Sequence, residues 1–512
     1  MRWKTTTNAR EKALAERLRR ASKFYVFLWS IREELFEDAF QDELGAAYDP
    51  RGQEPCPPAM LCMVNLLQRY TGLSDADTVD AAENDQRWQL VLGTLGKRRV
   101  PFGQGTLVRF RERSIGHDLD QKLVDRTVTL AKKSKKFDWR KLRVIFDSSP
   151  LEGAGRVEDT WNLIGRAMAK VVSAVAKATN VDVATIVEKA QLTLLKGPSI
   201  KAALDFDWSD PDERHEALQH LVGEAERLEA WVVKRLADDA SKPPVSDALK
   251  LLRRVVAQDL EPDPDGGGVR IRDGVAEDRV ISIGDPEMRH GRKSRSKTIR
   301  GFKRHIVIAN RIVLGAAVEP ANRPEARPTG RLIDAARKHG GISAVLVDRG
   351  YLPAPEVAEL WRSGVEVRSR AFRTGVDGFF GKELFKLQIK DGIAICPAGN
   401  LALISVKTNI AWFRESDCGK CPLKAQCTTS RQRAVRLHEN EPMLMELRAQ
   451  QATRTGRLAY RERTAVEHRL ARIDAIQGSK ARYKGVRKNE LDLRRAAAVA
   501  NLQEIDRQRR AA

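Results

Sequence analysis

The chain has 512 residues, with 91 lysines and arginines against 69 aspartates and glutamates, and a formal net charge of +22 at pH 7. A length of this order predicts several domains. Such a basic excess favours a polyanionic partner such as nucleic acid, because cationic side chains release counterions from phosphates. An arginine-rich protein without such a partner is the alternative. The sequence has no apolar run long enough to cross a membrane, and its charged N-terminus lacks the apolar centre of a signal peptide. We therefore expect a cytoplasmic, nucleoid-associated protein with no membrane partner.

The first part of the chain, residues 1–140, has a helical pattern. Ala59–Leu67 follows Pro57 and Pro58, a natural start for a helix. Thr106 is a plausible N-cap for the basic segment Thr106–Arg113. Its basic face suits DNA, although a solvated helix face explains it equally well. We predict a helical N-terminal domain that could bind DNA.

Two aspartates each follow a short apolar run. Val144, Ile145 and Phe146 indicate a buried strand that leads into Asp147. The Ser-Ser-Pro sequence that follows is expected to end this strand, since proline removes a ladder donor. The segment Ala344–Val347 leads into Asp348 in the same way. Open α/β sheets carry their chemistry at the carboxyl ends of strands, so the two carboxylates indicate metal-dependent chemistry on nucleic acid.

Further elements indicate the fold class. Residues 156–280 have a long helical pattern without strand alternation, and Glu261–Gly268 breaks it as a linker. His305–Ala309 and Ile312–Val318 predict a β-hairpin, and helices then alternate with strands. We predict a mixed α/β fold with a helical insertion after its first strand.

The most basic stretch of the chain follows the insertion. Its cations are interleaved with glycine, serine and threonine, which predicts a flexible loop suited to phosphate contacts. A solvated loop without a ligand is the alternative. The expected DNA-binding residues are Arg289, Arg292, Lys293, Arg295, Lys297, Arg300, Lys303 and Arg304. A second basic stretch, Lys480–Lys488, lies near the C-terminus.

Four of the six cysteines fall in one segment, at Cys396, Cys418, Cys421 and Cys427. A Cys-x-x-Cys pair flanked by single cysteines can supply four thiolates to a tetrahedral Zn²⁺ ion. A site with four protein ligands is closed, so we expect a structural zinc. Reduced thiols without metal are the alternative.

A charged helical segment near the C-terminus carries Tyr460, Arg463 and Glu467, which share one helical face at this spacing. A phenol, a cation and a carboxylate aligned in this way could complete a metal site and bind a phosphate. The pattern alone is weak, because charged helices often contain such triplets.

Several of these motifs, taken in order, resemble the DDE transposases of bacterial insertion sequences, and in particular the 1182-type group. They are Asp-Ser-Ser-Pro-Leu from Asp147, Gly-Ala-Gly-Arg-Val-Glu-Asp-Thr-Trp-Asn-Leu from Gly153, Asp-Pro-Glu-Met-Arg-His-Gly-Arg-Lys-Ser from Asp285, Asp-Arg-Gly-Tyr from Asp348, and Tyr-x-x-Arg-x-x-x-Glu from Tyr460. The resemblance covers nearly the whole chain. It implies a ribonuclease-H-like catalytic core behind the helical N-terminal domain.

The resemblance also implies roles for individual residues. Asp147, Asp348 and Glu467 would be the three catalytic carboxylates, with Tyr460 and Arg463 supporting them. They would hold two Mg²⁺ or Mn²⁺ ions per active site, since hard cations prefer oxygen ligands. Related transposases often have a lysine seven residues after the glutamate, but this chain has Asp474 there.

The expected organisation divides the chain into consecutive segments. These are a helical N-terminal domain at 1–140, the first core strand at 141–155, the helical insertion at 156–280, the remaining catalytic sheet with its basic loop at 281–395, a four-cysteine insertion at 396–430, the catalytic helix at 431–488 and a C-terminal helix at 489–512.

The expected function is to bind the terminal inverted repeats of an element as double-stranded DNA, cleave them and join them to target DNA. A homodimer or larger assembly is expected in the paired-end complex. A ribonuclease-H-like nuclease without strand transfer and a catalytically decayed, zinc-containing DNA-binding protein are the alternatives. Serine and tyrosine recombinases are disfavoured, because the motifs are carboxylates.

Overall fold

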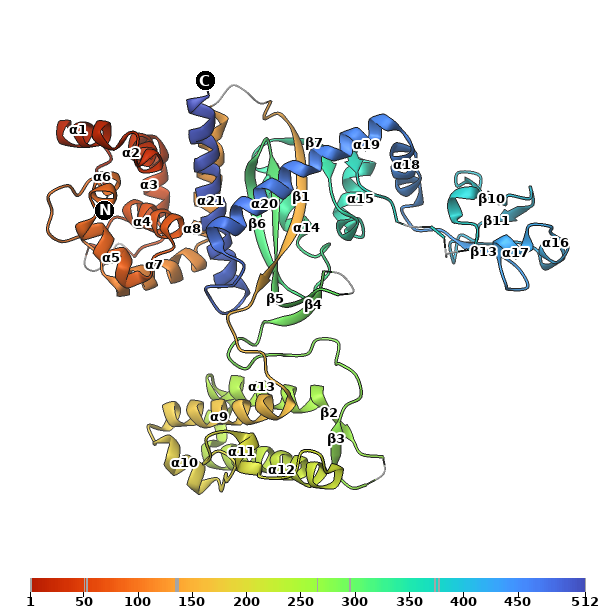
Figure 1. Ribbon diagram of the computed structural model, residues 1–512, viewed down its shortest axis with the longest axis horizontal. Coiled ribbons are helices and arrows are strands. Elements are labelled where there is room, and N and C mark those ends of the chain that lie inside the picture. The colour runs from red at the N-terminus through yellow and green to blue at the C-terminus, as the bar shows by residue number, and fades with distance from the viewer. Residues whose placement is uncertain are drawn as a thin grey trace.

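The computed structural model in Figure 1 describes the chain except for residues 1, 50, 52–53, 134–137, 265, 294–295, 373, 376–377 and 512. A central sheet is flanked by N-terminal helices on one side, a helical lobe below it and a small lobe to the right in this view. The mixed helix and strand content confirms the predicted α/β class.

The N-terminal helices pack around the apolar helix α4, whose first turn contains Pro58 and whose C-cap Gly72 has a φ of 76°. Most α4 side chains are buried, as the sequence pattern predicts. The helices are α1 (Ala9–Leu18), α2 (Lys23–Leu35), α3 (Asp38–Gly45), α4 (Pro58–Thr71), α5 (Asp75–Asn84), α6 (Gln86–Leu92), α7 (Gln104–Gly116) and α8 (Leu119–Lys132). Their core is continuous with that of the central sheet.

The central sheet has six strands, in the order β4-β5-β1-β7-β8, with β6 also paired to β5. β5 lies antiparallel to β1 and β6, whereas β7 lies parallel to both β1 and β8. The strands are β1 (Lys141–Glu152), β4 (Arg289–Arg292), β5 (Thr298–Ala309), β6 (Ile312–Pro320), β7 (Gly341–Leu346) and β8 (Glu366–Arg368). The predicted hairpin is confirmed as β5–β6, and both Asn310 and Arg311 in its turn have positive φ.

The first strand is longer than its sequence predicts. β1 does not end at Asp147 but continues through Pro150 to Glu152, paired with β5 throughout. Its parallel pairing with β7 stops earlier, at Ile145 and Leu346. Pro150 lies beyond this pairing with β7 and before the bridge from Glu152 to Lys480. Proline is tolerated at such an unpaired strand edge because no ladder donor is required there. The prediction that Ser-Ser-Pro ends the strand is therefore wrong.

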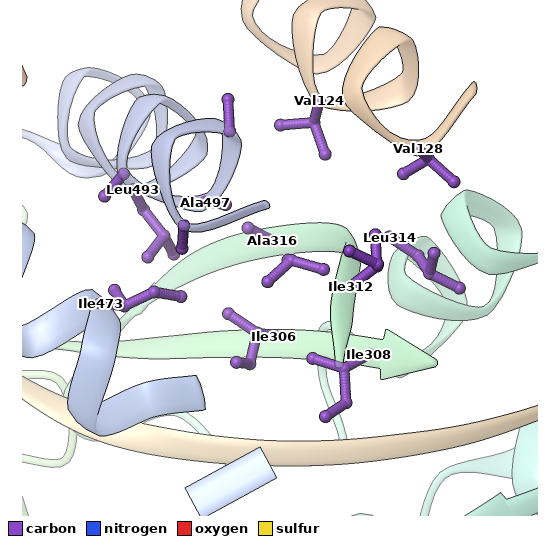
Figure 2. Packing of buried hydrophobic residues seen from close by; sticks show 14 of the residues in the cluster. Val124, Val128, Ile306, Ile308, Ile312, Leu314, Ala316, Ile473, Leu493 and Ala497 are labelled. Carbon is purple, nitrogen blue, oxygen red and sulfur yellow. The ribbon is translucent and has the colours of Figure 1, made fainter. Parts of the chain in front are cut away.

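Helices cover both faces of the sheet, and the long helix α21 (Val486–Arg510) lies against β6 and α8. Figure 2 shows this packing, in which branched residues of β5 and β6 meet residues of α8, α20 and α21. The labelled contacts come from Val124, Val128, Ile306, Ile308, Ile312, Leu314, Ala316, Ile473, Leu493 and Ala497. The other nearby helices are α14 (Thr329–Arg337), α15 (Pro355–Arg362), α18 (Glu441–Ala452), α19 (Arg454–Tyr460) and α20 (Thr464–Gln477).

The helical insertion forms a lobe with its own apolar core, separate from that of the sheet. Its elements are α9 (Thr160–Thr179), α10 (Val183–Lys189), α11 (Ile200–Leu204), α12 (Pro211–Leu236), α13 (Val245–Asp259), β2 (Leu260–Pro262) and β3 (Val269–Ile271). β2 and β3 pair antiparallel, so the predicted linker Glu261–Gly268 is in part a hairpin instead. Within the described residues, no helix is long and apolar enough to span a membrane.

The cysteine-rich segment forms the small lobe at the right of Figure 1, with a third apolar core that includes Phe385 and Phe413. Its elements are β9 (Lys386–Gln388), β10 (Ile393–Ile395), β11 (Leu401–Leu403), β12 (Ile410–Trp412), α16 (Glu415–Gly419), α17 (Lys424–Cys427) and β13 (Ala434–Arg436). The lobe thus interrupts the chain between the sheet and α18–α21.

Candidate active site

Asp147 of β1 and Asp348, two residues beyond the end of β7, lie at the same edge of the sheet. Ile145 of β1 pairs with Leu346 of β7, and each aspartate follows its paired residue by two positions. Asp147 Oδ1 accepts a hydrogen bond from the Ser148 N–H at 2.8 Å, and Asp348 Oδ1 accepts one from the Arg349 N–H at 2.9 Å. Although β1 continues beyond Asp147, the end of β7 opens this edge, so the two carboxylates meet where the sequence places them.

The Asp147 carboxylate lies in a partly buried, acidic environment, and its side chain is only 14% exposed. Burial raises the pKa of Asp147, and repulsion from Asp348 and Glu325 raises it further, while Arg463 and the Ser148 N–H act in the opposite direction. Carboxylates crowded in this way attract a cation.

Arg463 is the cation that faces Asp147, with its Nη1 3.3 Å from Asp147 Oδ1. Its Nη2 lies 3.1 Å from Glu467 Oε1, so one guanidinium bridges the two carboxylates. Its Cζ also lies 5.9 Å from the centre of the Tyr460 ring. The three residues do not share one regular helix, because the 3₁₀ turn Arg461–Arg463 separates α19 from α20.

Glu467 differs from the two aspartates in its surroundings. Its side chain is 54% exposed and is paired with Arg463. Among the described residues, no group of three or more histidine, cysteine, aspartate and glutamate side chains is arranged to hold a metal ion. Asp147, Asp348 and Glu467 therefore lie near one cation but not as a closed set of ligands. Asp474, at the position where relatives often have lysine, pairs with Arg304 instead.

The sequence reasoning missed Glu325, which lies between β6 and α14. The Ser148 hydroxyl donates a hydrogen bond to Glu325 Oε1 at 2.7 Å. Glu325 also contributes to the electrostatic environment of Asp147 and Tyr351. Its segment, Ala321–Pro328, has neither strand nor helix periodicity, so the only signal in the sequence was a carboxylate shortly after the predicted hairpin.

An open pocket of about 300 Å³ lies beside Tyr460. Four arginines, Arg368, Arg370, Arg457 and Arg461, are among its lining residues. The Arg370 guanidinium lies 5.7 Å from the centre of the Tyr460 ring. Burial raises the pKa of the Tyr460 phenol, with Arg463 opposing this shift. The pocket combines cations with an aromatic face, as sites for single-stranded nucleic acid do.

The basic stretch is not one flexible loop, because β4 and β5 form a hairpin in which Arg292 pairs with Thr298. Arg289 is 6% exposed and pairs with Asp278, and Arg304 is 1% exposed and pairs with Asp474. Their burial argues against phosphate contacts by these two arginines. Arg292, Lys293, Lys297 and Arg300 are exposed, Lys303 is half-buried and donates to the Arg323 carbonyl, and Arg295 lies outside the described residues.

The four clustered cysteines come together in the small lobe. Each is free and half-buried. Burial raises the pKa of the Cys427 thiol, Arg433 opposes the shift, and Cys418, Cys396 and Cys421 raise it further, so all four sulfurs interact. Their geometry does not form a ready metal site among the described residues.

Two family models match the chain. Residues 14–113 match a transposase domain, DUF772, and residues 395–505 match a transposase DDE domain. The first match spans α2–α7, and the second runs from the cysteine-rich lobe into α21 and includes Arg463 and Glu467. No curated protein and no solved structure matches.

A helical domain of this kind, joined to a sheet with an acidic edge and a DDE domain, defines a transposase. The pair of domains is typical of the 1182-type transposases of bacterial insertion sequences.

Proposed function

We propose that the protein binds the ends of its insertion sequence and catalyses metal-dependent cleavage and strand transfer on a ribonuclease-H-like core. The observation that carries the proposal is the placement of Asp147 and Asp348, each two residues beyond the paired Ile145 of β1 and Leu346 of β7. The sheet supports the proposed core, since β6, β5 and β1 are antiparallel and β7 and β8 continue it in parallel.

The donor chemistry of this edge fits a hard divalent cation. Asp147 and Asp348 supply carboxylate oxygens, and repulsion between carboxylates contributes to the raised pKa of Asp147. Two Mg²⁺ or Mn²⁺ ions, when bound, would activate the attacking oxygen and stabilise the leaving oxygen of an in-line phosphodiester displacement. The two aspartates would hold these ions, with Glu467 as a third carboxylate.

The chain's own cations prepare the site for DNA. Arg463 neutralises Asp147 and Glu467 in the metal-free protein, at 3.3 and 3.1 Å. If these carboxylates held a metal, the Arg463 guanidinium would be available to contact a phosphate. Tyr460 and the arginines of its pocket would hold the DNA strand beside the reacting phosphodiester.

Other parts of the chain would bind the DNA that this site cleaves. We propose that residues 1–140 bind element ends and that the β4–β5 hairpin binds the DNA backbone through its exposed cations. Two DNA ends must be held together for transfer, so the active form would be a homodimer or larger assembly.

Removal of three exposed cations of the β4–β5 hairpin is expected to weaken DNA binding and its salt dependence. The variant Arg292→Ala/Lys293→Ala/Arg300→Ala should lower the slope of log K against log [salt] by up to about three, since each phosphate contact contributes about 0.9. Fluorescence anisotropy with a labelled duplex at several salt concentrations measures the slope.

A control with the same loss of charge is Lys170→Ala/Lys177→Ala/Lys234→Ala, on exposed positions of α9 and α12. We expect its slope to stay closer to that of the wild type. Equal slopes for the two triple variants would show that only net charge matters and that the hairpin has no specific contact.

The four cysteines are expected to bind about one Zn²⁺ per chain, as a single four-thiolate site requires. The double variant Cys418→Ser/Cys421→Ser should lose it, because two of four ligands are removed. Metal content measured by elemental analysis of the purified protein tests this. The matched control is Cys62→Ser, a buried cysteine of α4, which should keep the zinc. If the purified wild type contained no zinc, the cysteines would be ordinary thiols and the prediction would be wrong.

The proposed function is tested with DNA that carries the element's own ends. Wild type with Mg²⁺ or Mn²⁺ should cleave at the ends and join them to target DNA, whereas Asp147→Ala, Asp348→Ala and Glu467→Ala should do neither. Cleavage without joining would favour a ribonuclease-H-like nuclease. Binding without cleavage would indicate a catalytically decayed DNA-binding protein.

A further inference from the structure

Glu325 is a carboxylate at the same sheet edge as Asp147 and Asp348. It belongs to the segment between β6 and α14, and its Oε1 accepts the hydrogen bond from Ser148, the residue next to Asp147. Its other carboxylate oxygen, Oε2, faces Gly350, in the turn that follows Asp348. A methyl group placed on Gly350 would lie 2.0 Å from Glu325 Oε2. The carboxylate of Glu325 thus lies between the residue after Asp147 and the turn after Asp348.

A buried polar chain fixes this position. The Tyr351 hydroxyl interacts with Ser148 on one side, and it lies 2.8 Å from His305 Nδ1 on the other. His305 and Tyr351 are both fully buried. Burial lowers the pKa of His305 to about 3, so its imidazole is neutral at physiological pH. His305, Tyr351, Ser148 and Glu325 therefore form one chain that orients the Glu325 carboxylate.

Glu325 and Glu467 differ in the groups that contact their carboxylates. The Arg463 guanidinium lies 3.1 Å from Glu467 Oε1, and the Glu467 side chain is more than half exposed. The Glu325 carboxylate accepts a hydrogen bond from a neutral hydroxyl, and it lies close enough to Asp147 for the two negative charges to repel each other. A carboxylate held rigidly by a neutral donor beside two others is suited to a cation.

We propose that Glu325 is a further metal-ligating carboxylate of the active site, beside Asp147 and Asp348. The three carboxylates are not preassembled as a metal site, so their side chains would turn toward the ion when it binds. This inference rests on the proposed function and goes beyond the carboxylate set that the sequence motifs indicate. Gly350 leaves room for the Glu325 carboxylate, because a side chain at this position would displace it.

The test measures Mn²⁺ binding separately from catalysis. Mn²⁺ is titrated into the full-length, DNA-free protein, and the free ion is followed by electron paramagnetic resonance. Glu325→Gln keeps the acceptor for the Ser148 hydroxyl but removes the charge, and we expect its Mn²⁺ affinity to fall at least about tenfold. Glu325→Asp keeps the charge with a shorter reach and should recover part of the affinity. Cleavage of end-bearing DNA should decrease in the same order.

A second variant keeps the proposal testable if Glu325→Gln folds poorly. Gly350→Ala leaves every carboxylate in place but crowds Glu325 Oε2, and it should also weaken Mn²⁺ binding. The matched control is Glu216→Gln, an exposed position on α12, which should bind Mn²⁺ as the wild type does. Circular dichroism confirms that each variant is folded.

The outcomes separate the inference from the proposed function. Wild-type Mn²⁺ affinity and cleavage in both folded variants, Glu325→Gln and Gly350→Ala, would overturn the role of Glu325 and leave the transposase proposal intact. Failure of the wild type to bind Mn²⁺ or to cleave would overturn both. Weakened Mn²⁺ binding in both variants, beside an unaffected Glu216→Gln, would establish Glu325 as a ligand.

Discussion

Asp348→Asn is expected to abolish DNA cleavage while leaving DNA binding largely unchanged. Asn keeps the size of the side chain and an oxygen that can accept from the Arg349 N–H, now at 2.9 Å, but it removes the charge that a divalent cation needs. Metal-ion catalysis contributes several kcal/mol, and each 1.4 kcal/mol is a factor of about ten in rate. The cleavage rate should therefore fall at least about a thousandfold, measured with end-bearing DNA and Mg²⁺.

The matched control is Asp334→Asn, the same chemical change on an exposed residue of α14 whose nearest cation is Arg337 at 3.8 Å. It should cleave at the wild-type rate. Duplex affinity of both variants is measured by anisotropy. Lost binding in Asp348→Asn would mean that the aspartate has a structural role, as the cap of the 3₁₀ turn Arg349–Tyr351.

The central part of the site could be predicted from sequence because it depends on local patterns. Branched apolar runs form β1 and β7, and the aspartate directly after each run lies just beyond the point where the pairing of the two strands ends. The hairpin β5–β6 is equally local, since Asn310 and Arg311 adopt the left-handed conformation that its turn requires.

Features that depend on tertiary pairing could not be predicted in this way. β1 can continue through Pro150 because its pairing with β7 has already ended at Ile145, and no local rule reports where a distant strand ends. Glu325 reaches Ser148 across 177 positions of sequence. The burial of Arg289 and Arg304 depends on Asp278 and Asp474. A count of charges along the chain cannot separate cations that are paired inside the fold from those that face solvent.

The N-terminal helices and the C-terminal helix are joined through a buried charged cluster. Asp492 of α21 is fully buried, and its Oδ1 lies 3.1 Å from Arg69 of α4 and 2.7 Å from Arg495. Arg495 also donates to Asn65 Oδ1 at 2.9 Å. The family matches place Arg69 in one domain and Asp492 in the other. This cluster therefore couples the two transposase domains through the core of the molecule.

Asp492→Ala is expected to destabilise the protein by about 3–5 kcal/mol, because removal of one partner leaves buried guanidiniums without compensation. Urea unfolding followed by circular dichroism should show a lower midpoint. Asp506→Ala, which breaks a half-exposed pair with Arg510 on the same helix, serves as the control and should cost less than about 1 kcal/mol.

The same cluster makes the stability of the folded protein depend on pH. Burial would raise the pKa of Asp492, but Arg495 and Arg69 outweigh it and the pKa is lowered. A carboxylate with a depressed folded-state pKa stabilises the protein fully above its unfolded value, about 3.9. That contribution is lost as the pH falls through the lower folded value. The difference in unfolding midpoint between wild type and Asp492→Ala should therefore be constant from pH 6 to 8 and shrink only below about pH 4. A difference that already shrinks near neutral pH would show that Asp492 is not held as a carboxylate by the two arginines.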